Sequence, residues 1–213
     1  MPCNCCEITD TVFNEETAKA DIKEYLKRGP AKQTKLILEA VRSLKLKNVS
    51  LLDVGGGIGT IYHELMQDVV DNVIHVDASS AYLKVAKDES AKRGYVENIN
   101  FIHADFTDVE KEVEQTDVVT LDRVVCCYPD YRALLTAAAQ HGKHAVVMTY
   151  PREVWYLRIG LGIINFFQKL RNDPFRVFIH PIQQMENLMK AHGFSRTRTH
   201  QLFVWEMSLY EKK

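Results

Sequence analysis

The sequence predicts an α/β fold, a three-layer sandwich with a mostly parallel seven-stranded sheet that ends in an antiparallel hairpin. Apolar runs alternate with helix-like periodicity from residue 50 to residue 149, which is typical of parallel strands joined by right-handed crossovers. A glycine-rich loop follows the first apolar run, at the carboxyl end where open sheets bind ligands. Two strand-like segments, 195–200 and 202–210, follow one another without room for a helix, so they must be antiparallel.

Each element of this prediction has a local signal. A first helix is expected over 14–29, because Asn14 suits its N-cap and Gly29 its end. Pro30 suits the first turn of a second helix that reaches about residue 45. Further helices are expected at 60–67, 79–93, 131–140 and 182–192, and five strands at 50–54, 73–77, 101–106, 117–121 and 144–149. We expect one domain over 1–213, with a helical lead-in at 1–46 and an insert at 151–181 that covers the substrate site.

Composition limits the kinds of partner. The chain has 213 residues, 46% of them hydrophobic and 26% charged, with a net charge of −1. Nucleic-acid binders usually carry a basic excess, so no nucleic-acid partner is expected. The first ten residues lack the pattern of a signal peptide, and the longest apolar run, 155–167, is too short to span a bilayer. These features predict a cytoplasmic protein with no membrane span.

The five cysteines form a poor disulfide framework, because their number is odd and two pairs are sequence neighbours. They are Cys3, Cys5, Cys6, Cys126 and Cys127. Reduced thiols are therefore expected. No metal site is expected, since no second ligand pair stands at a zinc spacing from the N-terminal cluster. Metal binding by that cluster remains the alternative.

The loop after the first strand indicates the kind of ligand. It contains Gly55, Gly56, Gly57 and Gly59. A dinucleotide site requires a further glycine at position 60, where this chain has Thr60. Asp53, just before the loop, would repel a pyrophosphate but attract an ammonium group. S-adenosylmethionine has an ammonium group and no phosphate.

Acidic residues also end the next two strands. Asp77 stands 18 residues after Gly59, close to the ~20-residue offset at which a carboxylate meets ribose hydroxyls. Asp105 can accept a hydrogen bond from an adenine amino group, with Phe106 against the ring face. Each aspartate can instead be a helix cap or a turn residue. Their occurrence at three successive strand ends favours a ligand.

With its D-x-G-x-G-x-G motif at Asp53, Gly55, Gly57 and Gly59, the chain resembles class I S-adenosylmethionine-dependent methyltransferases, whose sheet is Rossmann-like, over residues 51–213. The resemblance implies that S-adenosylmethionine is the cofactor and S-adenosylhomocysteine the product. It implies that the loop holds the methionyl group, Asp77 the ribose and Asp105 the adenine. The other cofactor contacts expected are Gly56, Ala78, Ala104, Phe106, Leu121, Asp122, Tyr25 and Thr34.

A closer similarity is to bacterial proteins described as magnesium-protoporphyrin O-methyltransferase-like. Three segments carry it, at 25–30, 121–130 and 174–181. The similarity implies a flat or carboxylate-bearing acceptor. Separately from this similarity, we expect Tyr25 and Thr34 of the lead-in helices to fold over the methionyl carboxylate.

The acceptor determines whether the enzyme needs a base. A carboxylate is nucleophilic as it stands, whereas a phenol, amine or thiol must lose a proton. His180 is the candidate base and Tyr128 the candidate orienting group, although both can be structural. Arg123, Arg152 and Trp155 are the other expected substrate contacts, with Arg158 as a further cation; an Asp122–Arg123 ion pair is the alternative for Arg123.

We therefore expect a methyltransferase that acts on a small molecule, by O-methylation of a carboxylate or of an aromatic, porphyrin-like compound. The absence of an Asn/Asp-Pro-Pro-Tyr/Phe motif after the fourth strand argues against a nucleobase amine. An RNA or protein methyltransferase, and a cofactor-binding protein without catalysis, are the alternatives. Thr60 and the C-terminal hairpin argue against a nicotinamide-dependent oxidoreductase.

Overall fold

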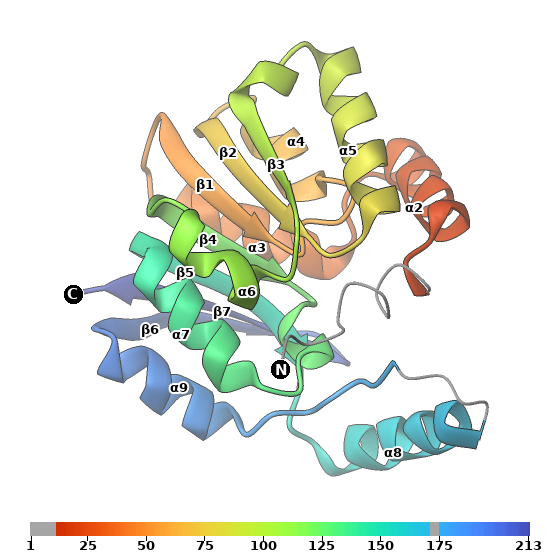
Figure 1. Cartoon of the computed structure of the whole chain (residues 1–213). Coiled ribbons are helices and arrows are strands. Elements are labelled where there is room, and N and C mark those ends of the chain that lie inside the picture. Colours follow the sequence, from red (N-terminus) through yellow and green to blue (C-terminus); the bar gives the residue numbers. More distant parts are fainter. Residues whose placement is uncertain (1–11, 171–174) are drawn as a thin grey trace.

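The computed structural model describes residues 12–170 and 175–213. Its described part contains one seven-stranded sheet in the order β3-β2-β1-β4-β5-β7-β6 (Figure 1). The strands are β1 (Val49–Val54), β2 (Val70–Asp77), β3 (Ile99–His103), β4 (Thr116–Asp122), β5 (Gly142–Pro151), β6 (Phe194–Gln201) and β7 (Trp205–Lys212).

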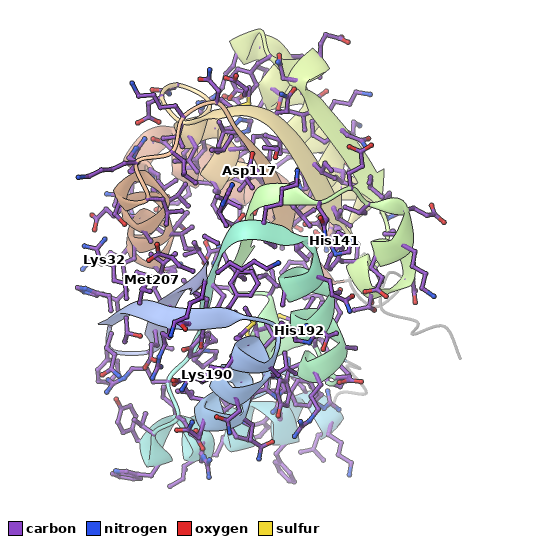
Figure 2. All side chains as sticks on the ribbon, turned by 90° about the vertical axis from the view of Figure 1, so that its left-hand side faces the viewer. Lys32, Asp117, His141, Lys190, His192 and Met207 are labelled. Carbon is purple, nitrogen blue, oxygen red and sulfur yellow. The ribbon has the colours of Figure 1, made fainter. Side chains whose placement is uncertain are left out.

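Strand direction confirms the predicted fold class. Strands β1 to β5 run parallel, whereas β7 is antiparallel to both β5 and β6. Figure 2 views the molecule from the hairpin side, with Met207 of β7 and the end of α9 (Ile182–Ala191) labelled. Because β1 to β5 are parallel, their carboxyl ends lie at the same end of the sheet. Ligands bind at this end in such folds.

Helices cover both faces of the sheet. On one face α3 (Lys32–Ser43) and α4 (Thr60–Leu65) pack on the centre, and α5 (Ser80–Arg93) lies against β2 and β3. The short α6 (Phe106–Val109), α7 (Tyr131–His141) and α9 lie on the other face (Figure 1). Alternation along β1 sends Leu51 to the first face and Leu52 to the second, and both are fully buried.

The lead-in differs from the prediction at one point. Helix α2 (Glu15–Arg28) has the expected cap, because the side chain of Asn14 accepts hydrogen bonds from the amides of Glu16 and Thr17. Pro30 does not open the second helix: α3 begins at Lys32, with extended Ala31 as its N-cap. Pro30 thus belongs to the three-residue connection between the helices.

The segment after β5 forms a continuous helix, α8 (Trp155–Leu170). It stands apart from α7 and α9 at the bottom of Figure 1. Three short 3-10 turns complete the described chain: η1 (Val96–Asn98), η2 (Glu110–Glu112) and η3 (Val125–Cys127). Within the described ranges, no helix has the length and apolar character needed to cross a bilayer.

Candidate functional site

The glycine loop joins β1 to α4 in a conformation that requires glycine. Gly59 is the N-cap of α4 with φ of +82°, and a Cβ there would lie 2.2 Å from the Tyr62 hydroxyl oxygen. Gly56 has a different constraint: its Cβ would lie 2.7 Å from Asp53 Oδ2 and 2.9 Å from His75 Nε2. The loop therefore lies directly on two buried polar side chains.

Those side chains belong to a polar row across three strands. Asp53 is in register with His75 of β2 and Thr120 of β4. The Thr120 hydroxyl donates to Asp53 Oδ1 at 2.7 Å, whereas Asp53 Oδ2 and His75 Nε2 are buried without a hydrogen-bond partner among the described residues. Burial raises the pKa of Asp53 to about 7. The structure thus places Asp53 beneath the loop, where it is fully buried.

Asp77 connects the end of β2 to the glycine loop. Its Oδ2 accepts from the Gly57 amide and its Oδ1 from the Ser79 amide, both at 2.8 Å. A carboxylate has about four lone-pair positions. Two remain for the ribose hydroxyls predicted to bind there. Of its neighbours, Ala78 accepts at its carbonyl from His103 Nε2 at 3.1 Å, and the Ala104 amide donates to the Asp77 carbonyl at 3.1 Å.

Asp105 is the N-cap of α6, and one of its carboxylate oxygens has no hydrogen-bond partner among the described residues. Its Oδ1 accepts from the Thr107 amide at 2.9 Å, the Thr107 hydroxyl at 2.8 Å and the Tyr128 hydroxyl at 2.7 Å. Its Oδ2 is buried without a partner among the described residues. Leaving a buried acceptor unpaired is costly, so this oxygen suits a donor such as the adenine amino group.

Two of the expected adenine and cofactor contacts are core residues. The Phe106 ring is 1% exposed and packs edge-to-face on His141, with centroids 5.4 Å apart. Leu121 is fully buried. Their side chains therefore pack on the protein interior, and the predicted contacts to the cofactor would have to come from their main-chain groups.

The end of β4 is held from two sides. Asp122 accepts from the hydroxyls of Thr34 at 2.6 Å and Thr149 at 2.5 Å. The next residue, Arg123, has φ of +63°, and its amide donates to the Thr149 hydroxyl at 2.9 Å. The Arg123 side chain is 51% exposed, with Nε 3.8 Å from Asp122 Oδ1. The alternative ion pair is thus present as a loose contact, and Thr34 serves to fasten α3 to β4.

Two aromatic residues of the lead-in contact the elements around the glycine loop. The Tyr25 hydroxyl donates to Glu64 of α4 at 2.8 Å. The Phe13 carbonyl accepts from the hydroxyl of Ser79, two residues beyond the end of β2, at 2.6 Å. The Phe13 ring contacts both Tyr82 and Phe175, with centroids 5.8 and 5.7 Å apart. Nothing in the local sequence marks Phe13 for this position.

His180 anchors the segment 175–181, which we call the strap. Its Nε2 lies 3.1 Å from the Val125 carbonyl and 2.9 Å from the Tyr128 carbonyl. Carbonyls only accept, so Nε2 carries the proton, and Nδ1 is the one ring atom that could act as a base. Burial lowers the pKa of His180, which favours the neutral ring. The Phe178 amide adds a bond of 2.7 Å to the Cys126 carbonyl.

The other predicted substrate residues have contacts of their own. Arg152 donates from its guanidinium to the Leu202 carbonyl at 3.4 Å, and Arg158 pairs with Glu153 at 2.5 Å. Trp155 is 74% exposed at the start of α8. Their contact with an acceptor stays a prediction.

Cys126 and Cys127 are free thiols in η3, with their sulfurs 3.9 Å apart. Cys3, Cys5 and Cys6 lie outside the described residues. Within the described part of the chain, no group of three or more histidine, cysteine or acidic side chains is arranged to hold a metal ion. Two shallow hollows lie near the amino ends of β4 and β5, opposite the glycine loop. One is beside Lys190 and Lys213, and the other is beside Gln115 and Gln140.

A family comparison adds to this geometry. Residues 51–144, from within β1 to the first residues of β5, match the model described as a methyltransferase domain. Residues 51–144 therefore form a methyltransferase domain. No curated protein matches the chain by sequence. The oxygens of Asp77 and Asp105 that have no protein partner fit the ribose and adenine donors of S-adenosylmethionine, the cofactor that the sequence predicts.

Solved structures share the fold at low sequence identity. Magnesium protoporphyrin IX methyltransferase from Synechocystis PCC 6803, with bound S-adenosylhomocysteine, has a TM-score of 0.70 and 16% identity over 85% of this chain and 83% of that chain. An O-methyltransferase family protein from Burkholderia thailandensis has a TM-score of 0.70 and 12% identity over 96% of this chain and 63% of that chain. The [4+2]-cyclase SpnF has a TM-score of 0.65 and 14% identity over 84% and 79%. Because proteins with such different activities share this fold, the fold does not identify the methyl acceptor. The acceptor has to be inferred from the residues of the site.

Proposed function

We propose that this methyltransferase acts in the cytoplasm on a small molecule and transfers the methyl group of S-adenosylmethionine to a carboxylate oxygen. The position and exposure of the Arg123 side chain carry the proposal. A half-exposed guanidinium stands at the end of β4, the strand next to the one that leads into the glycine loop. Its planar fork of donors matches a carboxylate.

The backbone at Arg123 supports a functional role. A non-glycine residue in the left-handed region costs on the order of 1–3 kcal/mol and persists where its surroundings hold it. Here the Thr149 hydroxyl accepts from the Arg123 amide and donates to Asp122, so one threonine ties both residues. The guanidinium is thus presented from a fixed main chain at the edge where the acceptor would approach.

A carboxylate acceptor also agrees with the chemistry of the two candidate catalytic residues. The Tyr128 hydroxyl donates to Asp105, and burial holds its pKa well above the usual value, so it does not provide a base near neutral pH. The Nε2 of His180 is occupied by two carbonyls. An acceptor that is already ionised needs no proton removed.

The proposed reaction is one displacement. Bound S-adenosylmethionine supplies an electrophilic methyl group on positively charged sulfur. The carboxylate oxygen forms the new bond to the methyl carbon, and the electron pair of the broken carbon–sulfur bond stays on sulfur. The negative and positive charges cancel and no proton moves. The protein's part is alignment and exclusion of water.

The test is methyl transfer from labelled S-adenosylmethionine to a panel of aromatic and porphyrin carboxylic acids. A methyl ester releases labelled methanol in alkali, whereas ethers and N-methyl groups do not. We expect alkali-labile label. Arg123→Gly, which removes the guanidinium without backbone strain, should lower kcat/KM by about 10- to 100-fold, the loss expected for charged hydrogen bonds of about 1.5–3 kcal/mol.

Arg158→Gly is the matched control, because it removes a cation that is already paired with Glu153. Its kcat/KM should stay within about twofold of the unmodified protein. Alkali-stable label, or label only in added RNA or protein, would contradict the carboxylate assignment. Binding of S-adenosylhomocysteine without turnover on any acceptor would favour a cofactor-binding protein instead.

A further inference from the structure

Helix α8 exposes an apolar stripe along its whole length. Trp155, Ile159, Ile163, Phe166 and Leu170 recur at helical spacing, so they share one side of the helix. Their exposed fractions run from 53% to 74%, and Phe167 beside them is 55% exposed. Contiguous apolar surface of this kind marks an interaction site. We call these six residues the stripe.

The opposite side of α8 is the side that holds it to the protein. Leu157, Leu161 and Asn165 are partly buried, and Asn165 bonds to the main chain of Val177 in the strap at 2.9 and 3.2 Å. In Figure 1 the strap passes above α8, between this helix and the sheet. The stripe is therefore the outer side of a fixed helix.

Aromatic and basic groups flank the stripe. Phe203, 76% exposed in the β6–β7 turn, stacks on Tyr156 with centroids 5.5 Å apart, so the apolar surface continues from α8 onto the hairpin. Residues 152–176 contain five basic and two acidic residues, whereas the whole chain has 27 basic and 28 acidic residues. One of the two acids, Glu153, is bound by Arg158 and by the Ile182 amide.

We propose that α8 docks on an anionic lipid surface and lies in the plane of the bilayer with the stripe in the acyl chains. Amphipathic helices with aromatic residues on one side and basic residues at the edge bind membranes in this way. Aromatic rings with a polar edge, such as Trp155 and Tyr156, suit the headgroup boundary. The helix is ~24 Å long at ~1.5 Å per residue, which is shorter than a bilayer core of ~30 Å.

The charges beside the stripe favour lipid over a second copy of the chain. Arg158 and Lys169 lie three helical turns apart on the same edge of α8. In a parallel pair of stripes Arg158 would face its own copy, and in an antiparallel pair it would approach Lys169. Paired helices usually place opposite charges across such a seam. An anionic surface attracts both residues.

Vesicle flotation with the full chain tests the proposal. The vesicles contain phosphatidylglycerol and phosphatidylcholine in equal parts, or phosphatidylcholine alone. We expect the protein to float with the anionic vesicles, to float less with neutral ones, and to detach in high salt. Ile163→Asp with Phe166→Asp should abolish flotation, whereas Ile163→Leu with Phe166→Leu should retain it.

Asn72→Asp with Gln140→Glu is the charge-matched control, because both side chains are exposed at the amino edge of the sheet. It should float like the unmodified protein. Heat of S-adenosylhomocysteine binding checks that each variant is folded, and Ile163→Ser with Phe166→Ser replaces the aspartate pair if that pair gives no heat.

Each contrary outcome overturns the proposal. The membrane proposal is wrong if the unmodified protein does not float with anionic vesicles. It is also wrong if a folded stripe variant still floats with them. A dimer in sedimentation velocity that the stripe variants dissociate, without vesicle binding, assigns the stripe to a second copy. None of these readouts depends on the methyl acceptor.

Discussion

The Tyr128 hydroxyl donates a hydrogen bond of 2.7 Å to Oδ1 of Asp105. With the two bonds from Thr107, this pairing occupies one oxygen of the carboxylate and leaves Oδ2 buried without a partner among the described residues. Tyr128 comes from the loop beyond β4, and Asp105 follows β3 as the N-cap of α6. The contact therefore sets the orientation of the carboxylate that we propose binds adenine, from the side where the acceptor would lie.

Tyr128→Phe tests this relationship. The substitution keeps the ring and removes one donor from Asp105, so we expect cofactor affinity to fall by about 3- to 10-fold, as for the loss of one hydrogen bond of about 0.5–1.5 kcal/mol. Turnover at saturating cofactor should change little. Calorimetry with S-adenosylhomocysteine measures the first quantity and initial rates the second. A large fall in kcat with unchanged affinity would instead support the predicted catalytic role of the hydroxyl.

Asp77→Ala is expected to weaken cofactor binding by about 1–3 kcal/mol, because it removes acceptors for the ribose and frees the Gly57 amide. Asp77→Asn keeps one acceptor and should lose less. Calorimetric titration of both variants separates the two effects. If alanine at this position left the affinity unchanged, the ribose assignment would fail, whatever the acceptor is.

Strand positions could be predicted because their signal is local. Each buried strand is a short apolar run that ends in an acid or a glycine, as at Asp53 and Asp77. The strands extend beyond those runs at their amino ends, and β2 begins at Val70 where only 73–77 was expected. Residues 70–72 include two exposed polar side chains, so hydrophobicity gives no signal for them.

Pairings between distant side chains could not be predicted from local signals. The offset from Gly59 pointed to Asp77, and the end of the third strand pointed to Asp105. Thr34 and Asp122, in contrast, are 88 residues apart and meet only because α3 packs beside β4. The hydrogen bond from Tyr25 to Glu64 likewise joins residues 39 positions apart, and it depends on how α2 packs on α5 and α4. Such contacts depend on how helices dock, which sequence patterns alone do not specify.

His180→Gln separates a structural from a basic role. Glutamine retains a donor that can reach the carbonyls of Val125 and Tyr128, but it cannot take up a proton near neutral pH. For a carboxylate acceptor we expect Gln to keep most of the turnover and Ala to lose more, because Ala releases the strap. A fall of about 100-fold or more for both variants, the usual contribution of a general base, would restore His180 as the base.

The buried carboxyl group of Asp53 should make the free energy of unfolding depend on pH in a specific way. Burial raises its folded pKa to about 7 from an ordinary value of 3.8, so the folded protein holds this proton up to about pH 7 whereas the unfolded chain releases it near pH 4. The folded state then binds more protons between these values, and the contribution of Asp53 to the free energy of unfolding falls as pH rises through this window.

Asp53→Asn removes that dependence, since an amide does not titrate but still accepts from the Thr120 hydroxyl. We expect Asp53→Asn to gain stability relative to the unmodified protein from about pH 4 to about pH 7, and the difference to be constant above that. Burial lowers the pKa of His63 to about 3, which gives the opposite slope in both proteins and cancels in their difference. Urea unfolding of both proteins across this range provides the measurement. A difference that stays flat with pH would show that Asp53 is ionised throughout and that the row beneath the glycine loop carries a fixed negative charge.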